Sequence, residues 1–124
     1  MTTIANPIKI LVVDDKKVIQ DFFDFTLGFY GHQITVVQDP SLVIGLVKEK
    51  SFDIVFLDMV MPDMDGLECL KKIKKNHPET IVIILSGLQD ERIAKEAIRY
   101  GAYDYLTKPF DLNYLKENIL GRIF

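Results

Sequence analysis

The stretch that decides the fold is Ile54-Val55-Phe56-Leu57-Asp58, in which four apolar residues end on a carboxylate. A short, continuous apolar run of this kind is typical of a parallel strand that is covered on both faces. Three other apolar runs also end on polar residues: 10–13 before Asp14-Asp15, 81–85 before Ser86, and 103–106 before Thr107-Lys108. Because the carboxyl ends of parallel strands meet at one edge of a sheet, we expect these polar side chains to lie together.

Strand-like and helix-like segments alternate along the whole chain. The expected strands cover residues 9–13, 34–37, 54–58, 81–85 and 103–106, and the expected helices cover residues 16–29, 41–50, 66–76, 90–100 and 111–123. Such βα units in series predict an α/β domain with a parallel sheet, helices on both faces and right-handed crossovers. We expect this single domain to occupy residues 8–124, preceded by a loose tail at residues 1–7.

Residues that favour turns and helix caps agree with this division. Asp39 precedes Pro40, an order typical of an N-cap followed by the first helical position. Asp111 precedes the last periodic apolar segment and is expected to cap it. Pro62 and the Asp65-Gly66 pair predict a turn after the third strand.

The overall composition excludes several classes of protein. With 124 residues, 48% of them hydrophobic, the chain is long enough to bury a core, and its net charge of −3 argues against a direct nucleic-acid binder. The single cysteine, Cys69, cannot form an internal disulfide and is expected to be a small core residue. His32 and His77 have no metal-ligand spacing. We see no signal peptide and no membrane-spanning segment, so we expect a cytoplasmic protein.

Five polar residues carry the expected chemistry: Asp14, Asp15, Asp58, Ser86 and Lys108. Adjacent carboxylates at a strand end repel each other, and hard oxygen ligands suit Mg²⁺ together with a phosphate oxygen. An aspartate can also carry a phosphoryl group covalently. Each residue has an ordinary structural explanation, namely a helix-capping pair, a turn aspartate, a loop serine and a solvated lysine. It is improbable that all these explanations hold together in this order.

The chain resembles, from end to end, the receiver domains of two-component response regulators. The matching motifs are Val13-Asp14-Asp15, residues 57–66 (Leu-Asp-Met-Val-Met-Pro-Asp-Met-Asp-Gly), Leu85-Ser86-Gly87, and residues 101–110 (Gly-Ala-Tyr-Asp-Tyr-Leu-Thr-Lys-Pro-Phe). Together these motifs are highly specific, although any one of them is a weak signal. The resemblance implies a flavodoxin-like (βα)5 sandwich with strand order 2-1-3-4-5.

The resemblance also implies a role for each site residue. Asp58 would accept a phosphoryl group from a histidine kinase or a histidine phosphotransfer protein. Asp15, Asp58 and the backbone carbonyl of Val60 would hold Mg²⁺ (or Mn²⁺) directly, and Asp14 would reach the ion through water. Ser86 and Lys108 would bind phosphoryl oxygens, and Tyr105 would be the aromatic switch. The transfer would be self-catalysed, so we do not expect an enzyme that acts on external substrates.

Two surfaces are expected to meet partners. The output face would comprise the fourth helix, fifth strand and fifth helix and would contact a downstream protein or a second copy; its expected contributors are Ile93, Ala97, Tyr105 and Tyr114. In this family, kinase partners dock beside the first helix, whose apolar arc is unusually wide and leaves Phe25 and Phe29 at one margin, partly exposed. Extra packing beneath neighbouring side chains is the alternative explanation for that arc.

Two other functions stay open from the residues alone. A small magnesium-dependent phosphatase resembling haloacid dehalogenases would use an aspartyl intermediate, but such enzymes carry Asp-x-Asp after the first strand, where this chain has Asp14-Asp15-Lys16. A phosphate-independent interaction module is the other alternative, and the intact set of five polar residues argues against it. We expect either a free-standing receiver or a piece of a longer regulator.

Two apolar positions predict a long-lived phosphoryl group. The resemblance places Val60 and Leu88 beside the path of the hydrolytic water, where neither side chain can orient water by hydrogen bonding. Replacing Leu88→Glu or Val60→Asn should therefore change the lifetime of the phosphorylated protein, measured as the decay of the phosphorylated mass after the donor is removed. Unaltered decay in both variants would contradict this explanation.

Overall fold

A five-stranded parallel sheet forms the centre of the computed structural model, which describes residues 7–29, 31–61, 64–87 and 91–121. The strands are β1 (Lys9–Val13), β2 (Gln33–Val37), β3 (Ile54–Asp58), β6 (Ile81–Ser86) and β7 (Asp104–Thr107). Their order is β2-β1-β3-β6-β7, and every neighbouring pair is parallel. This order confirms the predicted 2-1-3-4-5 arrangement, and each predicted strand is present to within one residue at either end.

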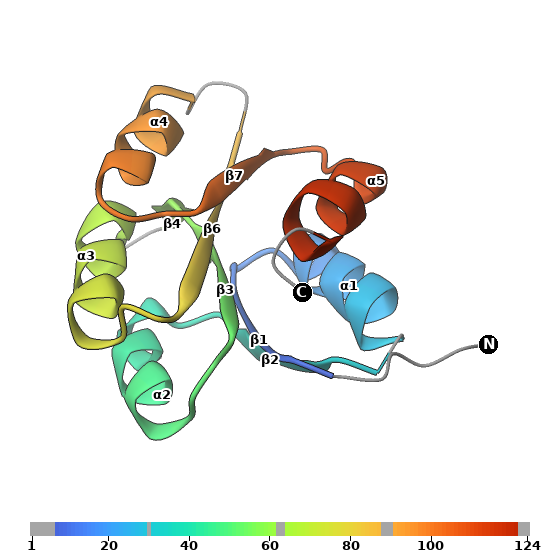
Figure 1. The fold of residues 1–124 in the computed structure, drawn as a ribbon, viewed down its shortest axis with the longest axis horizontal. Coiled ribbons are helices and arrows are strands. Elements are labelled where there is room, and N and C mark those ends of the chain that lie inside the picture. The colour runs from blue at the N-terminus through green and yellow to red at the C-terminus, as the bar shows by residue number, and fades with distance from the viewer. Residues whose placement is uncertain (1–6, 30, 62–63, 88–90, 122–124) are drawn as a thin grey trace.

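Helices cover both faces of the sheet, as predicted. The helical elements are α1 (Lys17–Phe23) with a π-helical continuation (Asp24–Gly28), a 3-10 turn (Pro40–Leu42) leading into α2 (Val43–Glu49), α3 (Gly66–Asn76), α4 (Glu91–Arg99), and α5 (Leu112–Tyr114) with a π-helical continuation (Leu115–Leu120). Figure 1 shows α1 and α5 on one face, and α2, α3 and α4 on the other. None of these described helices is long and apolar enough to cross a membrane.

The predicted helix at residues 16–29 is correct in place but not uniform in type. Its second half widens into a π-helical segment, and there the Thr26 hydroxyl donates a hydrogen bond of 2.6 Å to the carbonyl of Phe22. A bond of this kind from residue i to residue i−4 competes with the regular backbone ladder and often bends helices. The hydrophobic period of the sequence does not reveal such a change, because the π-helical segment is only five residues long.

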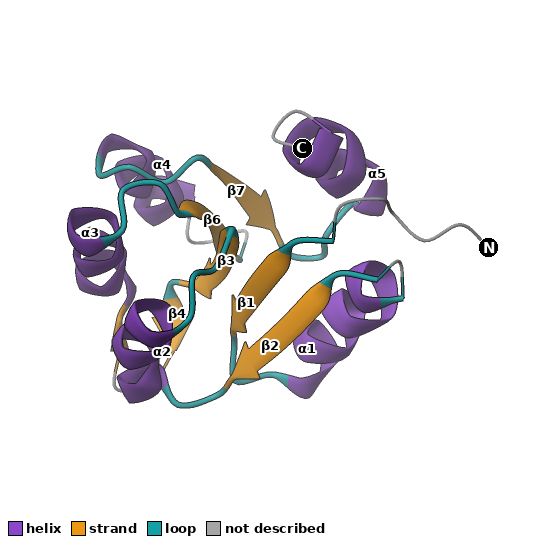
Figure 2. Ribbon diagram, turned by 60° about the horizontal axis from the view of Figure 1, so that its bottom comes forward, coloured by secondary structure: helices purple, strands orange, loops and turns teal. Residues whose placement is uncertain are grey.

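Alternating strand residues divide the interior into two apolar cores. Figure 2 shows the helices that cover these cores on the two sides of the sheet. In β3, Ile54 and Phe56 face α1 and α5, whereas Val55 and Leu57 face α2, α3 and α4. Both sets are fully buried, which explains why the strand is apolar without alternation. Cys69 lies in the second core as predicted, and burial raises the pKa of its thiol to about 11.

A short hairpin after β3 was not predicted. The backbone of β4 (Val60–Met61) pairs in antiparallel fashion with β5 (Met64–Asp65), where the sequence predicted only a turn. Two-residue strands are too short to show a hydrophobic period, so pattern analysis cannot detect them. Pro62 and Asp63 lie outside the described residues.

The predicted caps are present. The Asp39 carboxylate accepts a hydrogen bond of 3.0 Å from the backbone N–H of Ser41, with Pro40 in the next position. Asp111 accepts hydrogen bonds from the backbone N–H groups of Asn113 and Tyr114 at 2.9 and 3.3 Å. These bonds satisfy N–H groups that a helix start leaves without partners.

Two glycines in helices should respond to alanine in opposite ways. A Cβ added at Gly66 would lie 2.8 Å from the Cα of Met59, the residue after Asp58, whereas nothing lies within 4 Å of a Cβ at Gly45. Gly66→Ala should therefore lower the free energy of unfolding by about 1–3 kcal/mol through overpacking. Gly45→Ala should raise it by about 0.5–1 kcal/mol, because alanine suits a helix interior better. Urea unfolding followed by circular dichroism measures both, and a Gly66→Ala midpoint at or above the wild-type value would contradict the close contact.

Folding stability should fall below neutral pH because of His32. Its Nδ1 accepts a hydrogen bond of 3.1 Å from the backbone N–H of Ile8, and burial lowers its pKa from 6.5. The unfolded chain therefore binds more protons than the folded one, and this contribution to stability is complete above about pH 6.5 and declines as the pH falls below it.

The His32→Asn variant keeps an acceptor oxygen but cannot titrate. Its free energy of unfolding, measured by urea denaturation between about pH 7 and about pH 5, should decline less than that of the wild type. Equal declines in the two proteins would contradict the role given to His32.

Candidate functional site

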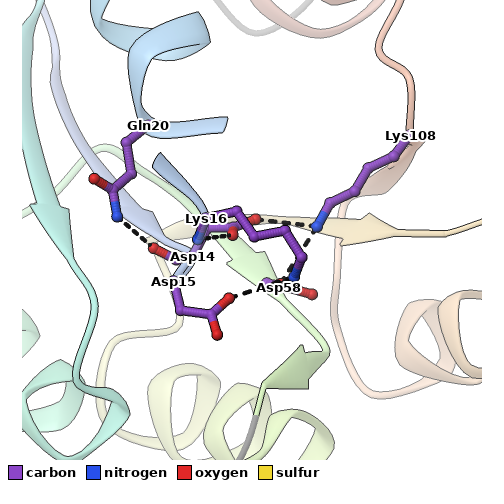
Figure 3. A network of polar contacts seen from close by, with 6 residues as sticks. All are labelled: Asp14, Asp15, Lys16, Gln20, Asp58 and Lys108. Atoms are coloured by element: carbon purple, nitrogen blue, oxygen red, sulfur yellow. Dashed lines mark hydrogen bonds and ion pairs between the residues drawn. The ribbon is translucent and has the colours of Figure 1, made fainter. Parts of the chain in front are cut away.

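The predicted site residues meet at the carboxyl edge of the sheet. Asp14 follows β1, Asp58 ends β3, Ser86 ends β6, and Lys108 follows β7. Because these four strands are neighbours in the sheet, the connections place residues from the whole length of the chain side by side. Figure 3 shows the polar network that Asp14, Asp15, Asp58 and Lys108 form there.

Three carboxylates lie unusually close together in this network. One oxygen from each of Asp14, Asp15 and Asp58 lies within 4.8 Å of the others. The residues Asp14 and Asp58 are 0% and 2% exposed, whereas Asp15 lies at the surface. Like charges at such distances and in such burial raise the energy of the folded state unless cations compensate them.

Two ammonium groups provide part of that compensation. The Lys108 Nζ lies 3.1 Å from Asp14 Oδ2 and 3.3 Å from Asp58 Oδ2. The Lys16 Nζ lies 3.3 Å from Asp15 Oδ1 and 3.8 Å from Asp58 Oδ2. The alternative explanation of Lys108 as a solvated surface lysine therefore does not hold, because its side chain is only 21% exposed and contacts two buried carboxylates.

Lys16 also belongs to this site, although it was not predicted as a site residue. Its position directly after the acidic pair was the available signal, because a side chain of that length can fold back over the strand end. Burial lowers the pKa of Lys16, but the negative charges of Asp58, Asp15 and Asp14 outweigh that effect, so its pKa is raised. The ammonium group is therefore charged at neutral pH.

Backbone and amide groups hold Asp14 in place. The Asp14 Oδ1 accepts a hydrogen bond of 2.8 Å from the backbone N–H of Lys16. Lys16 is the N-cap residue before α1, so this bond closes a local turn and does not cap a helical N–H as the alternative explanation required. The Gln20 Nε2 donates to the Asp14 carbonyl oxygen at 2.9 Å, and the Gln38 Nε2 donates to Gln20 Oε1 at 3.4 Å. Gln20 was also missed, since an amide on a helix surface has no distinctive pattern.

Ser86 presents a buried hydroxyl with an unmet hydrogen-bonding capacity. The residue is 1% exposed, and in the described part of the chain no group bonds to its Oγ. Its backbone carbonyl accepts a hydrogen bond of 2.7 Å from the N–H of Lys108, which links the ends of β6 and β7. A buried polar atom without a partner costs free energy, so a ligand oxygen at this point would stabilise the site.

The donor set fits a hard divalent cation with a bound oxyanion. Mg²⁺ prefers carboxylate, carbonyl and water oxygens, and the clustered carboxylates together with the hydroxyl of Ser86 and the ammonium of Lys108 provide matching chemistry. The backbone of Val60 lies in β4, two residues after Asp58. Leu88 lies outside the described residues, so the predicted lifetime of the phosphoryl group stays a prediction.

The expected output face needs one correction. Ile93 and Tyr114 are both 39% exposed, and Tyr105 is half-buried against the core beneath α2, α3 and α4. Ala97 was predicted at the surface but is fully buried, because together with Ala94 it forms the row of α4 that packs on the sheet. Alanines three residues apart on one face of a helix, such as Ala94 and Ala97, indicate close packing of the helix and not a surface that contacts a partner.

The first helix presents more apolar surface than predicted. The residues Phe25 and Phe29 are 81% and 58% exposed, and Val18 near the start of α1 is 71% exposed. Packing beneath neighbouring side chains therefore does not explain Phe25, whereas Phe22 and Phe23 pack in the core with Phe110. Tyr30 lies outside the described residues.

Known proteins resemble this chain in sequence and in fold. Residues 10–120 match the family model of the response regulator receiver domain. The probable transcriptional regulatory protein TcrX of Mycobacterium tuberculosis is 35% identical over 110 residues, which are 87% of this chain and 46% of that protein. The transcriptional regulatory protein ZraR of Salmonella typhimurium is 34% identical over 116 residues, which are 94% of this chain and 26% of that protein.

A solved structure agrees with these matches. The receiver domain of NtrX from Brucella abortus superimposes with a TM-score of 0.84 at 36% identity, over 92% of this chain and 96% of that domain. The chain thus spans a quarter to a half of these curated relatives, but nearly all of a solved receiver domain. The chain belongs to the response regulator receiver domain family, whose members accept phosphoryl groups in two-component signalling.

Proposed function

We propose that Asp58 accepts the phosphoryl group, with Mg²⁺ (or Mn²⁺) bound beside it. The observation that carries this proposal is the position of the Asp58 carboxylate, which is 2% exposed and lies within 4 Å of the ammonium groups of both Lys16 and Lys108. Asp58 ends β3, the central strand, so groups from β1, β6 and β7 surround it. No other carboxylate among the described residues contacts both lysines.

The reaction is a transfer from phosphohistidine to a carboxylate. The bond between phosphorus and the donor histidine nitrogen breaks, a bond between phosphorus and an Asp58 oxygen forms, and the histidine leaves with the electron pair of the broken bond. Asp15, Asp58 and the carbonyl of Val60 would hold the metal directly, and Asp14 would hold it through water. When bound, the metal neutralises negative charge that develops on the phosphoryl oxygens.

The remaining site residues turn phosphorylation into a change of shape. The ammonium of Lys108 can pair with a phosphoryl oxygen in place of its present carboxylate partners. The hydroxyl of Ser86 donates to a second phosphoryl oxygen and moves toward it. Tyr105, half-buried beside β6, then rotates inward and alters the surface of α4, β7 and α5. The new charge thus biases an element with two packing arrangements.

The proposed partners follow from the family. Receiver domains interact with histidine kinases and with downstream effectors. For this chain we propose a histidine kinase or phosphotransfer protein as the donor, docking beside α1, in the cytoplasm. The output would pass from the receiver domain, residues 8–124, to a protein target or a second copy through α4, β7 and α5, without direct contact to nucleic acid. The transfer and the later hydrolysis would be self-catalysed.

Chemical phosphorylation tests the acceptor directly. The protein incubated with acetyl phosphate and Mg²⁺ should gain one phosphoryl group, seen by intact mass spectrometry and located on Asp58 by peptide mapping. Removal of Mg²⁺ with a chelator should prevent the gain, because the carboxylates would then repel the incoming anion. The Asp58→Asn variant should gain nothing.

Asp53 provides the matched control, because it lies next to the opposite end of β3, where its carboxylate accepts a hydrogen bond from the backbone N–H of Lys9. Asp53→Asn should be phosphorylated like the wild type. An adduct on another residue, or one that persists in Asp58→Asn, would overturn the proposal.

A further inference from the structure

The Lys16 ammonium lies beside two of the carboxylates that would hold a divalent cation. It contacts Asp15 and Asp58, at 3.3 and 3.8 Å. These are the two carboxylates proposed to hold the metal directly, whereas Lys108 contacts Asp58 from the side of Asp14. Figure 3 shows the Lys16 side chain extended across the site from the start of α1.

The charge of the site changes sign if the metal enters and both lysines stay. Three carboxylates and two ammonium groups leave one negative charge in the network. A divalent cation added to this arrangement would leave one positive charge, with an ammonium and a metal ion a few ångströms apart. Departure of one lysine restores neutrality and removes that repulsion.

Lys16 is the lysine that can leave at little cost. Its side chain is 54% exposed and attached at the N-cap of α1, so the ammonium can move into water without opening the core. The Lys108 side chain is 21% exposed, and both of its carboxylate partners are buried. Pairs of exposed charges contribute little to stability, whereas a buried charge left without its partner is costly.

We infer that Lys16 is a resident counter-ion that competes with Mg²⁺ for Asp15 and Asp58 and swings into solvent when the metal binds. This inference rests on the proposed metal site and adds a residue that sets its affinity. The ammonium of Lys16 keeps the carboxylates together before the metal arrives, and its displacement weakens metal binding. The consequence is a receiver that needs a higher concentration of Mg²⁺ to be ready for phosphorylation.

Magnesium titration by isothermal titration calorimetry, without any phosphoryl donor, tests this competition. Lys16→Met removes the charge and keeps the apolar stem, so its dissociation constant for Mg²⁺ should fall by about 3- to 10-fold. Lys16→Arg keeps the charge and should bind Mg²⁺ within about twofold of the wild type. The gain in melting temperature on adding Mg²⁺ should be larger for Lys16→Met than for the wild type, because tighter binding stabilises the folded state more.

The neighbouring lysine is the matched control. Lys17 pairs with Asp21 at 3.1 Å on the exposed surface of α1, so Lys17→Met loses the same charge one residue away from the site. Its dissociation constant should stay at the wild-type value. If the Mg²⁺ affinity of Lys17→Met increases as much as that of Lys16→Met, the inference is overturned, because the effect would then reflect net charge alone.

The remaining outcomes separate this inference from the metal site itself. If Asp15→Asn loses Mg²⁺ binding but Lys16→Met binds no more tightly than the wild type, the role of Lys16 is wrong and the metal site stands. If the wild type and Lys16→Met both fail to bind Mg²⁺, the metal site and the inference fall together.

Discussion

The rest of this structure depends on one electrostatic constraint, the convergence of three carboxylates at the edge of a parallel sheet. The strand order that buries the two apolar cores also places Asp14 and Asp58 side by side, both almost without exposure, next to Asp15. Their repulsion opposes folding unless nearby cations offset it. The two lysines and the hydrogen bonds to Asp14 stabilise these clustered carboxylates. The chemistry of the site depends on the same cluster.

The two lysines meet this constraint in different ways. Lys108 is fixed between buried carboxylates, and its backbone N–H also bonds to the carbonyl of Ser86, so its movement is coupled to the end of β6. Lys16 reaches the same Asp58 from a solvent-exposed position and can leave without disturbing either core. Lys108, which is bonded to the end of β6, is suited to transmit a change at the site to that strand. Lys16, which has no such link among the described residues, is suited to be exchanged for a metal ion.

The sequence predicted the parts of the molecule that depend on long periodic patterns. The strands around Phe56 and Val12 and the meeting of Asp14, Asp15 and Asp58 follow from buried apolar runs that end on polar residues. The strand order, in contrast, was implied by the family resemblance and not by these runs. The β4–β5 hairpin has strands too short to show a period, and the buried Ala97 was predicted at the surface by analogy with the expected output face. The role of Lys16 depends on a side-chain path through space, which no spacing along the chain encodes.

Ser86 connects an energetic cost of the folded state to the proposed function. Its hydroxyl is buried with no partner in the described structure, on the strand that pairs with both β3 and β7. An oxyanion on Asp58 would give that hydroxyl an acceptor and Lys108 a stronger one, so the free energy lost in the resting state is regained only in the modified state. The proposed phosphorylation of Asp58 would therefore favour movement of the β6 end toward Asp58. Tyr105, the proposed switch residue, pairs with Ile84 near that end of β6.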